Sequence, residues 1–237
     1  MNKLAVIGES AENLISPLER RGYTVIVMPR FSLLNSPICS HPDTLFARIG
    51  RYIITSKEYY EAARSQLDAI YDISGSSLLL DDVSQSSPYP NEARFNVFSS
   101  DGFVIGNKNI ASPKIFEACE KQNLQFIHVN QGYSACSTAR CFNGGITADN
   151  GIYSALASIG TNSLKIRPGH IKLEKYEYGF IGGAAGFDDS SNTMYFNGDV
   201  STHPDSSVIL EFLKSSQTNV VSLTGGPLVD CGGIVFF

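Results

Sequence analysis

The sequence lacks any apolar run approaching the ~20 residues of a membrane-spanning helix, so no membrane span is predicted. It also lacks a basic excess. The formal net charge is -5, which disfavours nucleic acid and anionic membranes as partners. The apolar run near the N-terminus is too short for the core of a signal peptide, so we expect a cytoplasmic protein. With 43% hydrophobic and 17% charged residues, the composition is that of a folded domain.

Cysteine is scarce and odd in number. Five are present, and an odd count without a secretion signal favours free thiols. Cys136 and Cys141 form the one close pair, but their spacing matches no common zinc signature and no cluster of histidines accompanies them. We therefore expect neither a metal nor an organic cofactor.

A pattern of hairpin, helix and strand recurs along the chain with a period of roughly 40 to 50 residues, in the range that signals stacked or radial repeats. Each unit is too small to bury its own apolar face, so packing five around an axis would supply the core. Helices are expected over about 10–21, 57–70, 113–123, 150–159 and 203–215. Strands are expected over 4–7, 23–28, 44–49, 52–55, 78–80, 94–98, 103–105, 124–129, 135–140, 145–148, 163–166, 171–173, 178–184, 193–196, 219–223 and 234–237.

The first and last expected strands look incomplete unless they pair with each other. We therefore predict one α/β domain over residues 1–237, a five-bladed αβ-propeller whose ring is closed by the N- and C-terminal strands. A single open α/β sheet is the alternative. In either case Cys231 lies between a turn at 225–227 and the last strand, and Gly232 and Gly233 free the backbone beside it to take unusual dihedrals.

Four short stretches accompany this repeat pattern: His41-Pro-Asp-Thr-Leu-Phe46, Gln131-Gly-Tyr-Ser134, Gly169-His-Ile-Lys-Leu173 and Leu228-Val-Asp-Cys-Gly232. Together with the repeats they resemble the pentein superfamily, which includes arginine deiminases, amidinotransferases and dimethylarginine dimethylaminohydrolases. The resemblance covers the whole chain as architecture and only these stretches as motifs. It implies Cys231 as the nucleophile, His170 as the general acid/base, and Asp43 and Gln131 as the residues that hold the substrate.

The chain also departs from the pattern. Gln131 stands where those enzymes have a Glu, and Ala47-Arg48 stands where the dimethylarginine enzymes have a carboxylate pair. Both changes remove negative charge from a pocket meant for a cation, which a guanidinium binds through paired carboxylates. Asp149, Asp199 or Asp230 could compensate, and the sequence does not decide among them.

Each candidate also has a purely structural interpretation. Cys231 could be a small buried hydrophobe, His170 could bond a backbone carbonyl, and Asp43 could cap the turn after Pro42. The first functional hypothesis is a Cys-dependent hydrolase or transferase acting on a guanidine- or amidine-like small molecule. The second is a non-catalytic binding protein of the same fold, similar to the ribosome anti-association factor or directed at another protein. The oligomeric state is not predictable.

Overall fold

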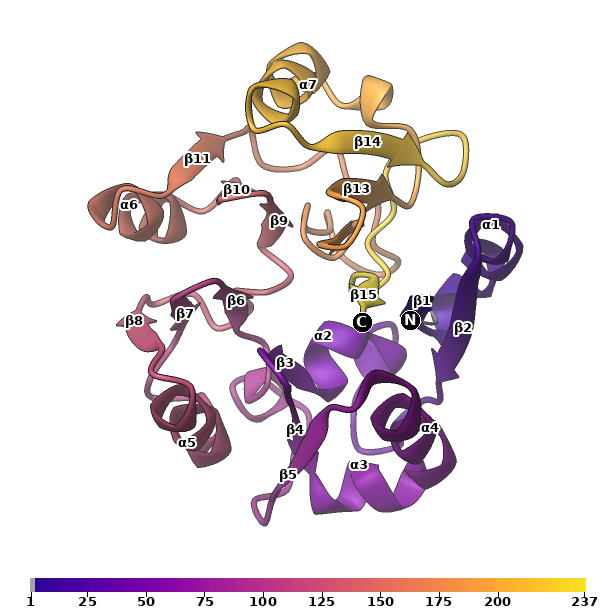
Figure 1. Cartoon of the computed structure of the whole chain (residues 1–237), viewed down its shortest axis with the longest axis vertical. Coiled ribbons are helices and arrows are strands. Elements are labelled where there is room, and N and C mark those ends of the chain that lie inside the picture. The colour runs from indigo at the N-terminus through magenta and orange to yellow at the C-terminus, as the bar shows by residue number, and fades with distance from the viewer. Residues whose placement is uncertain (1–2) are drawn as a thin grey trace.

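Five small three-stranded sheets surround a common centre in the computed structural model, which describes residues 3–237 (Figure 1). In each sheet the first strand is antiparallel to the second, and the second is parallel to the third. Helical segments connect the second strand to the third, as a parallel pairing requires. The predicted repeat of hairpin, helix and strand is therefore confirmed.

The five sheets, in chain order of their middle strands, consist of the following strands: β15 (Val235–Phe236), β1 (Lys3–Gly8) and β2 (Tyr23–Met28); β3 (Ala47–Ile49), β4 (Tyr52–Ser56) and β5 (Ser77–Asp81); β6 (Phe98–Ser100), β7 (Phe103–Gly106) and β8 (Gln125–His128); β9 (Thr138–Cys141), β10 (Gly144–Thr147) and β11 (Asn162–Lys165); β12 (Ala185–Asp188), β13 (Thr193–Phe196) and β14 (Asn219–Ser222). Within the described residues these sheets remain separate from one another.

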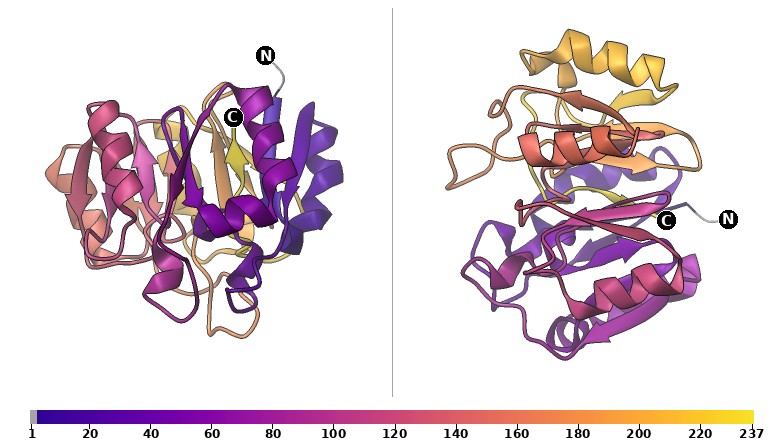
Figure 2. Two further views of the ribbon diagram at one scale, coloured as in Figure 1. Left: turned by 90° about the horizontal axis from the view of Figure 1, so that it is seen from below. Right: turned by 90° about the vertical axis from the view of Figure 1, so that its left-hand side faces the viewer.

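The connecting helices lie on the outside of the ring of sheets (Figures 1 and 2). They are η1 (Glu9–Leu14), α1 (Ile15–Glu19), α3 (Lys57–Ala62), α4 (Arg64–Ser74), α5 (Pro113–Lys121), α6 (Asn150–Ser158) and α7 (Ser206–Ser215). Shorter helical turns lie in the connections: η2 (Ile38–Ser40), α2 (Pro42–Leu45), η3 (Asn91–Ala93) and η4 (Val200–Thr202). No helix within residues 3–237 is long and apolar enough to cross a membrane.

The two ends of the chain meet in one sheet. β15 pairs antiparallel with β1, Ala5 opposite Phe236 and Val6 opposite Val235, as the incomplete look of the terminal segments predicts. Neighbouring units also share their apolar cores. Ile49 and Ile54 of one unit pack in the same buried cluster as Val104 of the next. This arrangement gives each small sheet the buried surface that it cannot form alone.

Several element predictions are wrong. Residues 44–45, expected in a strand, belong to α2, because Pro42 takes the first helical position and its fixed φ suits a helical turn. Residues 171–173 and 178–184, expected as strands, are irregular, and one isolated bridge joins Lys172 to Val229. The predicted helix at 150–159 is confirmed as α6, and its cap is Asp149, whose carboxylate accepts a hydrogen bond from the amide of Ile152.

Candidate functional site

The first strand of every unit borders the centre of the molecule. One cavity of about 440 Å³ is lined by residues of β3, β6, β9, β12 and β15. The segments that lead into these strands therefore converge at one end of that cavity. This convergence brings together polar residues that are far apart in the sequence: Asp43 on α2, Asn96 before β6, Cys136 before β9 and Asp230 before β15.

Cys136 is the thiol at this point of convergence. Its Sγ donates to Oδ2 of Asp43 at 2.7 Å, and the Nδ2 amide of Asn96 donates to Sγ at 3.0 Å. The side-chain oxygen Oδ1 of Asn96 accepts hydrogen bonds from the backbone amides of Ala135 and Cys136, and these bonds fix the orientation of the side-chain amide. The thiol is therefore held between a carboxylate and an amide donor.

Asp230 supplies a second buried carboxylate to the same cluster. Its Oδ2 accepts from the amide of Phe180 at 2.8 Å, and its Oδ1 accepts from the amide of Gly232 at 3.0 Å. Nδ1 of His41 lies 3.8 Å from Oδ1 of Asp230. His41 is 1% exposed, and this burial lowers its pKa, so the imidazole is neutral near pH 7.

The electrostatics of the cluster are unusual because two carboxylates lie close together and are both buried from solvent. Burial and the charge of Asp230 raise the pKa of Asp43 to about 7, and burial raises the pKa of Asp230. Burial and both carboxylates raise the pKa of the Cys136 thiol well above its ordinary value. Within residues 3–237 neither carboxylate forms an ion pair with a Lys or Arg. A cationic ligand would relieve this repulsion.

A cavity of about 290 Å³ opens onto the cluster. His41, Cys136 and Asp230 lie among aromatic side chains and one further carboxylate, and the lining includes Tyr133, Tyr176, Tyr178, Phe180 and Glu177. Aromatic faces attract cations through their quadrupole, and carboxylates attract them by charge. The cavity thus offers a small organic cation both kinds of favourable contact beside a thiol. We refer to it as the thiol cavity.

The structure does not gather the four predicted site residues in one cavity, although Asp43 and Cys231 are neighbours through the hydrogen bond from the amide of Asp43 to the carbonyl oxygen of Gly232. Asp43 belongs to the cluster just described, and it also lines the 440 Å³ cavity. Cys231 is 2% exposed and packs in an apolar cluster with Ile234 and Phe236, where burial raises its pKa to about 12. Its Sγ lies 3.5 Å from the carbonyl oxygen of Gly183, and it does not line the thiol cavity.

His170 and Gln131 lie in two other places. His170 has a φ of 63°, packs edge to face on His203 and lines a separate cavity with Lys172 and Glu174. The Gln131 amide donates to Asp149 at 3.2 Å and its carbonyl oxygen accepts from the amide of Tyr133, an arrangement that holds the start of α6. Within residues 3–237, His170 and Gln131 line different cavities and Cys231 lines neither of them, so their catalytic and substrate-binding roles remain predictions.

Sequence reasoning missed Cys136, His41 and Asn96 as members of a site. His41 immediately precedes the Pro-Asp pair of the motif, and the spacing of Cys136 and Cys141 bears only on metal binding. Asp230 was one of three carboxylates that the sequence left open. The other two have structural roles: Asp149 caps α6 and Asp199 caps η4. Position relative to the strands is the signal that could identify them, because Cys136 and Asp230 each lie a few residues before the first strand of a unit.

Comparison with known proteins gives both a family and a fold. A family model described as a family of unknown function (DUF6873) matches residues 5–235. The chain belongs to this family. No curated protein matches it. Among solved structures, an adduct of dimethylarginine dimethylaminohydrolase with S-methyl-L-thiocitrulline has a TM-score of 0.57 at 10% identity, covering 100% of both chains.

Two further structures agree. The dimethylarginine dimethylaminohydrolase of Pseudomonas aeruginosa, complexed with citrulline, has a TM-score of 0.55 at 11% identity and covers 100% of both chains. SxtG, an amidinotransferase of the saxitoxin biosynthetic pathway from Microseira wollei, has a TM-score of 0.57 at 14% identity, covering 94% of this chain and 81% of its own. All are pentein superfamily members, so the fold of this chain is the pentein fold, as the sequence motifs indicated.

Proposed function

We propose that the protein is a Cys-dependent hydrolase or transferase that acts on a guanidinium- or amidinium-type small molecule in the thiol cavity. One observation supports this most directly: the Cys136 thiol is hydrogen-bonded to Asp43 at 2.7 Å, beside a second buried carboxylate without a cationic partner in residues 3–237. In this proposal Cys136 takes the nucleophilic role that the sequence suggested for Cys231, because Cys136 lines the cavity whereas Cys231 packs in an apolar cluster and does not line it.

The cation would bind first through charge and shape. A planar amidinium or guanidinium offers N–H donors in a fork, which matches carboxylate oxygens bidentately. Asp230 lines the cavity and has both oxygens held by backbone amides, so it is already oriented. A bound cation also stabilises the negative charge of a thiolate, which counters the effect of burial on the Cys136 pKa.

The proposed reaction has two covalent steps. Sγ of Cys136 bonds to the central carbon of the cation while the thiol proton passes to Asp43, and the bond from that carbon to one nitrogen breaks. The departing amine leaves with the proton that Asp43 held. Water then bonds to the carbon and the carbon–sulfur bond breaks. One of the two protons of that water returns to sulfur, and the other passes to a base. His41, a neutral imidazole in the cavity lining, is suited to take a proton from that water. An amine in place of water would make the reaction a transfer.

A matched pair of alkylating reagents tests this proposal. Chloroacetamidine is cationic and chloroacetamide is neutral, and both lose chloride to a thiol. We expect the cation to label Cys136 about tenfold faster or more than the neutral reagent, because an oriented ion pair contributes of the order of 1.4 kcal/mol. Asp230→Asn should remove this preference while keeping the hydrogen bond between Cys136 and Asp43. Peptide mass spectrometry identifies the labelled thiol.

Asp72→Asn is the control variant, because Asp72 is exposed on α4 and carries the same charge. It should keep the preference for the cation. Equal rates with the two reagents, or selective labelling of Cys231, would contradict the proposed site. A screen of guanidines and amidines for release of ammonia or amine then identifies the substrate.

A second candidate function is cation binding without a covalent step. It is favoured by the same burial that raises the pKa of Cys136 and keeps the thiol protonated in the unbound protein. This candidate predicts calorimetric binding of guanidinium compounds that Asp230→Asn weakens, with no turnover and no thiol adduct.

A further inference from the structure

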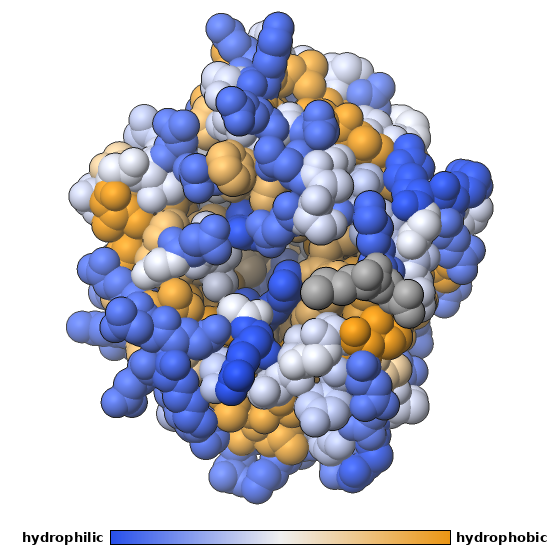
Figure 3. Space-filling view, in the orientation of Figure 1, coloured by the Kyte–Doolittle hydropathy of each residue, from blue (hydrophilic) through white to orange (hydrophobic). Residues whose placement is uncertain are grey.

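The 440 Å³ cavity is distinct from the thiol cavity and lies on the other side of Asp43. It reaches residues at the far ends of the first strands, such as Ser100, Arg140 and Asp189, whereas the thiol cavity lies among the segments that lead into those strands. In the space-filling view the face turned toward the viewer is hollowed at its centre, where hydrophilic and apolar side chains meet (Figure 3). We refer to this hollow as the central cavity.

Arg48 enters the central cavity from β3 and has no carboxylate partner in residues 3–237. Its guanidinium donates to the carbonyl oxygen of Phe236 and lies 4.6 Å from the centre of the Phe237 ring. Burial lowers its pKa, the charge of Asp189 raises it and that of Arg140 lowers it, and arginine stays protonated in proteins. Its direct contacts are a peptide carbonyl and a ring face.

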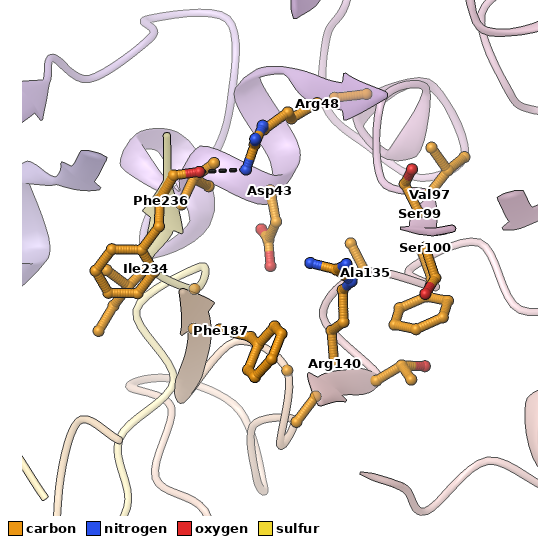
Figure 4. A pocket seen from close by; sticks show the side chains of 18 of the residues that line it. Asp43, Arg48, Val97, Ser99, Ser100, Ala135, Arg140, Phe187, Ile234 and Phe236 are labelled. Carbon is orange, nitrogen blue, oxygen red and sulfur yellow. Dashed lines mark hydrogen bonds between the residues drawn. The ribbon is translucent and has the colours of Figure 1, made fainter. Parts of the chain in front are cut away.

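Arg140 enters the same cavity from β9 (Figure 4). Nη1 of Arg140 bonds to Asp189 at 2.7 Å, and the guanidinium lies 5.2 Å from the centre of the Phe187 ring. Its Nε is buried without a hydrogen-bond partner. Thr138 lies two positions earlier on β9, so its side chain faces the same side, and its buried hydroxyl also lacks a partner. Two buried groups with donor hydrogens thus line the cavity without acceptors, which is costly unless a ligand supplies one.

Among residues 3–237, the acidic residues of the lining form no ion pair with Arg48. Asp189 is already paired with Arg140, and Asp101, 3.9 Å from Nη2 of Arg140, has a side chain that is 94% exposed. Asp43 accepts the hydrogen bond from Cys136 on its other side. Arg48 therefore has no carboxylate within ion-pair distance among residues 3–237, and the unpartnered donors of Arg140 and Thr138 favour a ligand that brings acceptor oxygens.

Most of the remaining lining is apolar. Phe46, Phe95, Phe98, Phe187 and Phe236 all contribute to the wall. A free inorganic oxyanion would leave these rings without contacts, whereas an apolar group attached to the anion would pack against them. We propose that the central cavity binds a small organic monoanion, a carboxylate on an apolar body, whose oxygens accept from Arg48, Arg140 and Thr138.

Benzoate is the probe for this site, and benzyl alcohol and inorganic phosphate are matched comparisons. Calorimetry on the full chain should detect benzoate binding, with weaker or undetectable binding of the neutral alcohol and of phosphate. Arg48→Gln should weaken benzoate binding about tenfold, since it removes one charge-assisted contact. Arg64→Gln is the control, because Arg64 is exposed and pairs with Glu61 on the outside of the molecule. It should leave binding unchanged.

This proposal does not depend on the proposed enzyme activity. A measurement of benzoate binding by the wild-type protein is enough to contradict it, and the variant adds a further test. It is wrong if benzoate does not bind, if phosphate binds as tightly as benzoate, or if benzoate binding is the same in Arg48→Gln. Should that variant fail to fold, Arg140→Lys replaces it and should weaken benzoate by a similar factor, because a lysine lacks the planar fork. Unchanged affinity in that variant would equally contradict the proposal.

Discussion

Asp43 connects the two cavities. It lines the central cavity, and its carboxylate accepts a hydrogen bond from Cys136, which lines the thiol cavity. Sequence motifs identified Asp43 because the His-Pro-Asp stretch is contiguous. They did not identify Cys136 or Asn96, whose contact with Asp43 depends on where the first strands of other units begin. A local motif can thus reveal one member of a site whose other members are assembled only by the fold.

Ionisation of Asp43 should make stability fall as pH rises. Its pKa rises from an ordinary 3.8 to about 7 in the folded protein, so the folded state binds the proton more tightly than the unfolded chain. Unfolding free energy therefore decreases between these two pH values, and it is lowest once Asp43 is ionised. Asp43→Asn removes this penalty. We expect the variant to gain roughly 2–4 kcal/mol relative to wild type between pH 4 and pH 8.

Urea unfolding of both proteins at pH 4, 6 and 8 measures this difference. Asp72→Asn again serves as the control, because an exposed carboxylate should show no such trend. A gap between wild type and Asp43→Asn that stays constant with pH would mean that Asp43 titrates normally in the folded protein.

At the scale of single elements, the turn before β15 determines how the last strand meets the cluster. Gly232 has a φ of 77°, and its carbonyl oxygen accepts from the amide of Asp43 at 3.1 Å. A Cβ at this position would lie 2.3 Å from Cβ of His41. The glycine that the sequence analysis linked to the freedom of Cys231 thus permits the close approach of His41 and Asp43.

Gly232→Ala should destabilise the protein by about 3 kcal/mol or more, because positive φ costs an L-residue about 1–2 kcal/mol and the clash adds to it. Gly226→Ala is a matched comparison. Its φ is 79° and a Cβ there would have no neighbour within 4 Å, so only the backbone cost of about 1–2 kcal/mol applies. Urea unfolding gives both values. Equal losses would show that the approach to His41 is not tightly packed.

The same scale explains which elements could be predicted. Segments with regular apolar patterns, such as 23–28 and 113–121, form the expected strand and helix. The predictions of strands are wrong where a segment with a strand-like pattern has no neighbouring strand to pair with. Tyr178 and Phe180 alternate as in a strand, but residues 178–184 do not form one, and the Phe180 amide bonds to Asp230 instead. Strand formation depends on a neighbouring edge, and a single segment does not reveal whether one is present.

At the scale of the whole molecule, the repeat period predicted five units and a shared terminal sheet. It could not predict the site, because Asp43 and Cys136 are 93 positions apart and come from different units. Convergence of the first strands also creates two cavities with opposite preferences. Within residues 3–237, the thiol cavity is lined by Asp230 and Glu177 without Lys or Arg, and the central cavity is lined by Arg48 and Arg140 as well as aspartates.

If both proposals hold, the two cavities should bind their ligands cooperatively. A cation in the thiol cavity and an anion in the central cavity lie on either side of Asp43 and attract each other through a protein interior that salt screens only weakly. We expect methylguanidinium chloride to tighten benzoate binding by about threefold to tenfold, a coupling of roughly 1 kcal/mol.

Calorimetry of benzoate binding with and without methylguanidinium measures this coupling, with potassium chloride at the same ionic strength as the control. By thermodynamic linkage, benzoate must tighten methylguanidinium binding by the same factor, so the reverse titration is an internal check. Asp230→Asn should abolish the coupling by weakening the cation while leaving benzoate bound. If the two ligands bind independently, the charges do not interact across Asp43. If they exclude each other, one ligand occupies both cavities, and the site accepts a single molecule with its cation at Asp230 and its carboxylate at Arg48.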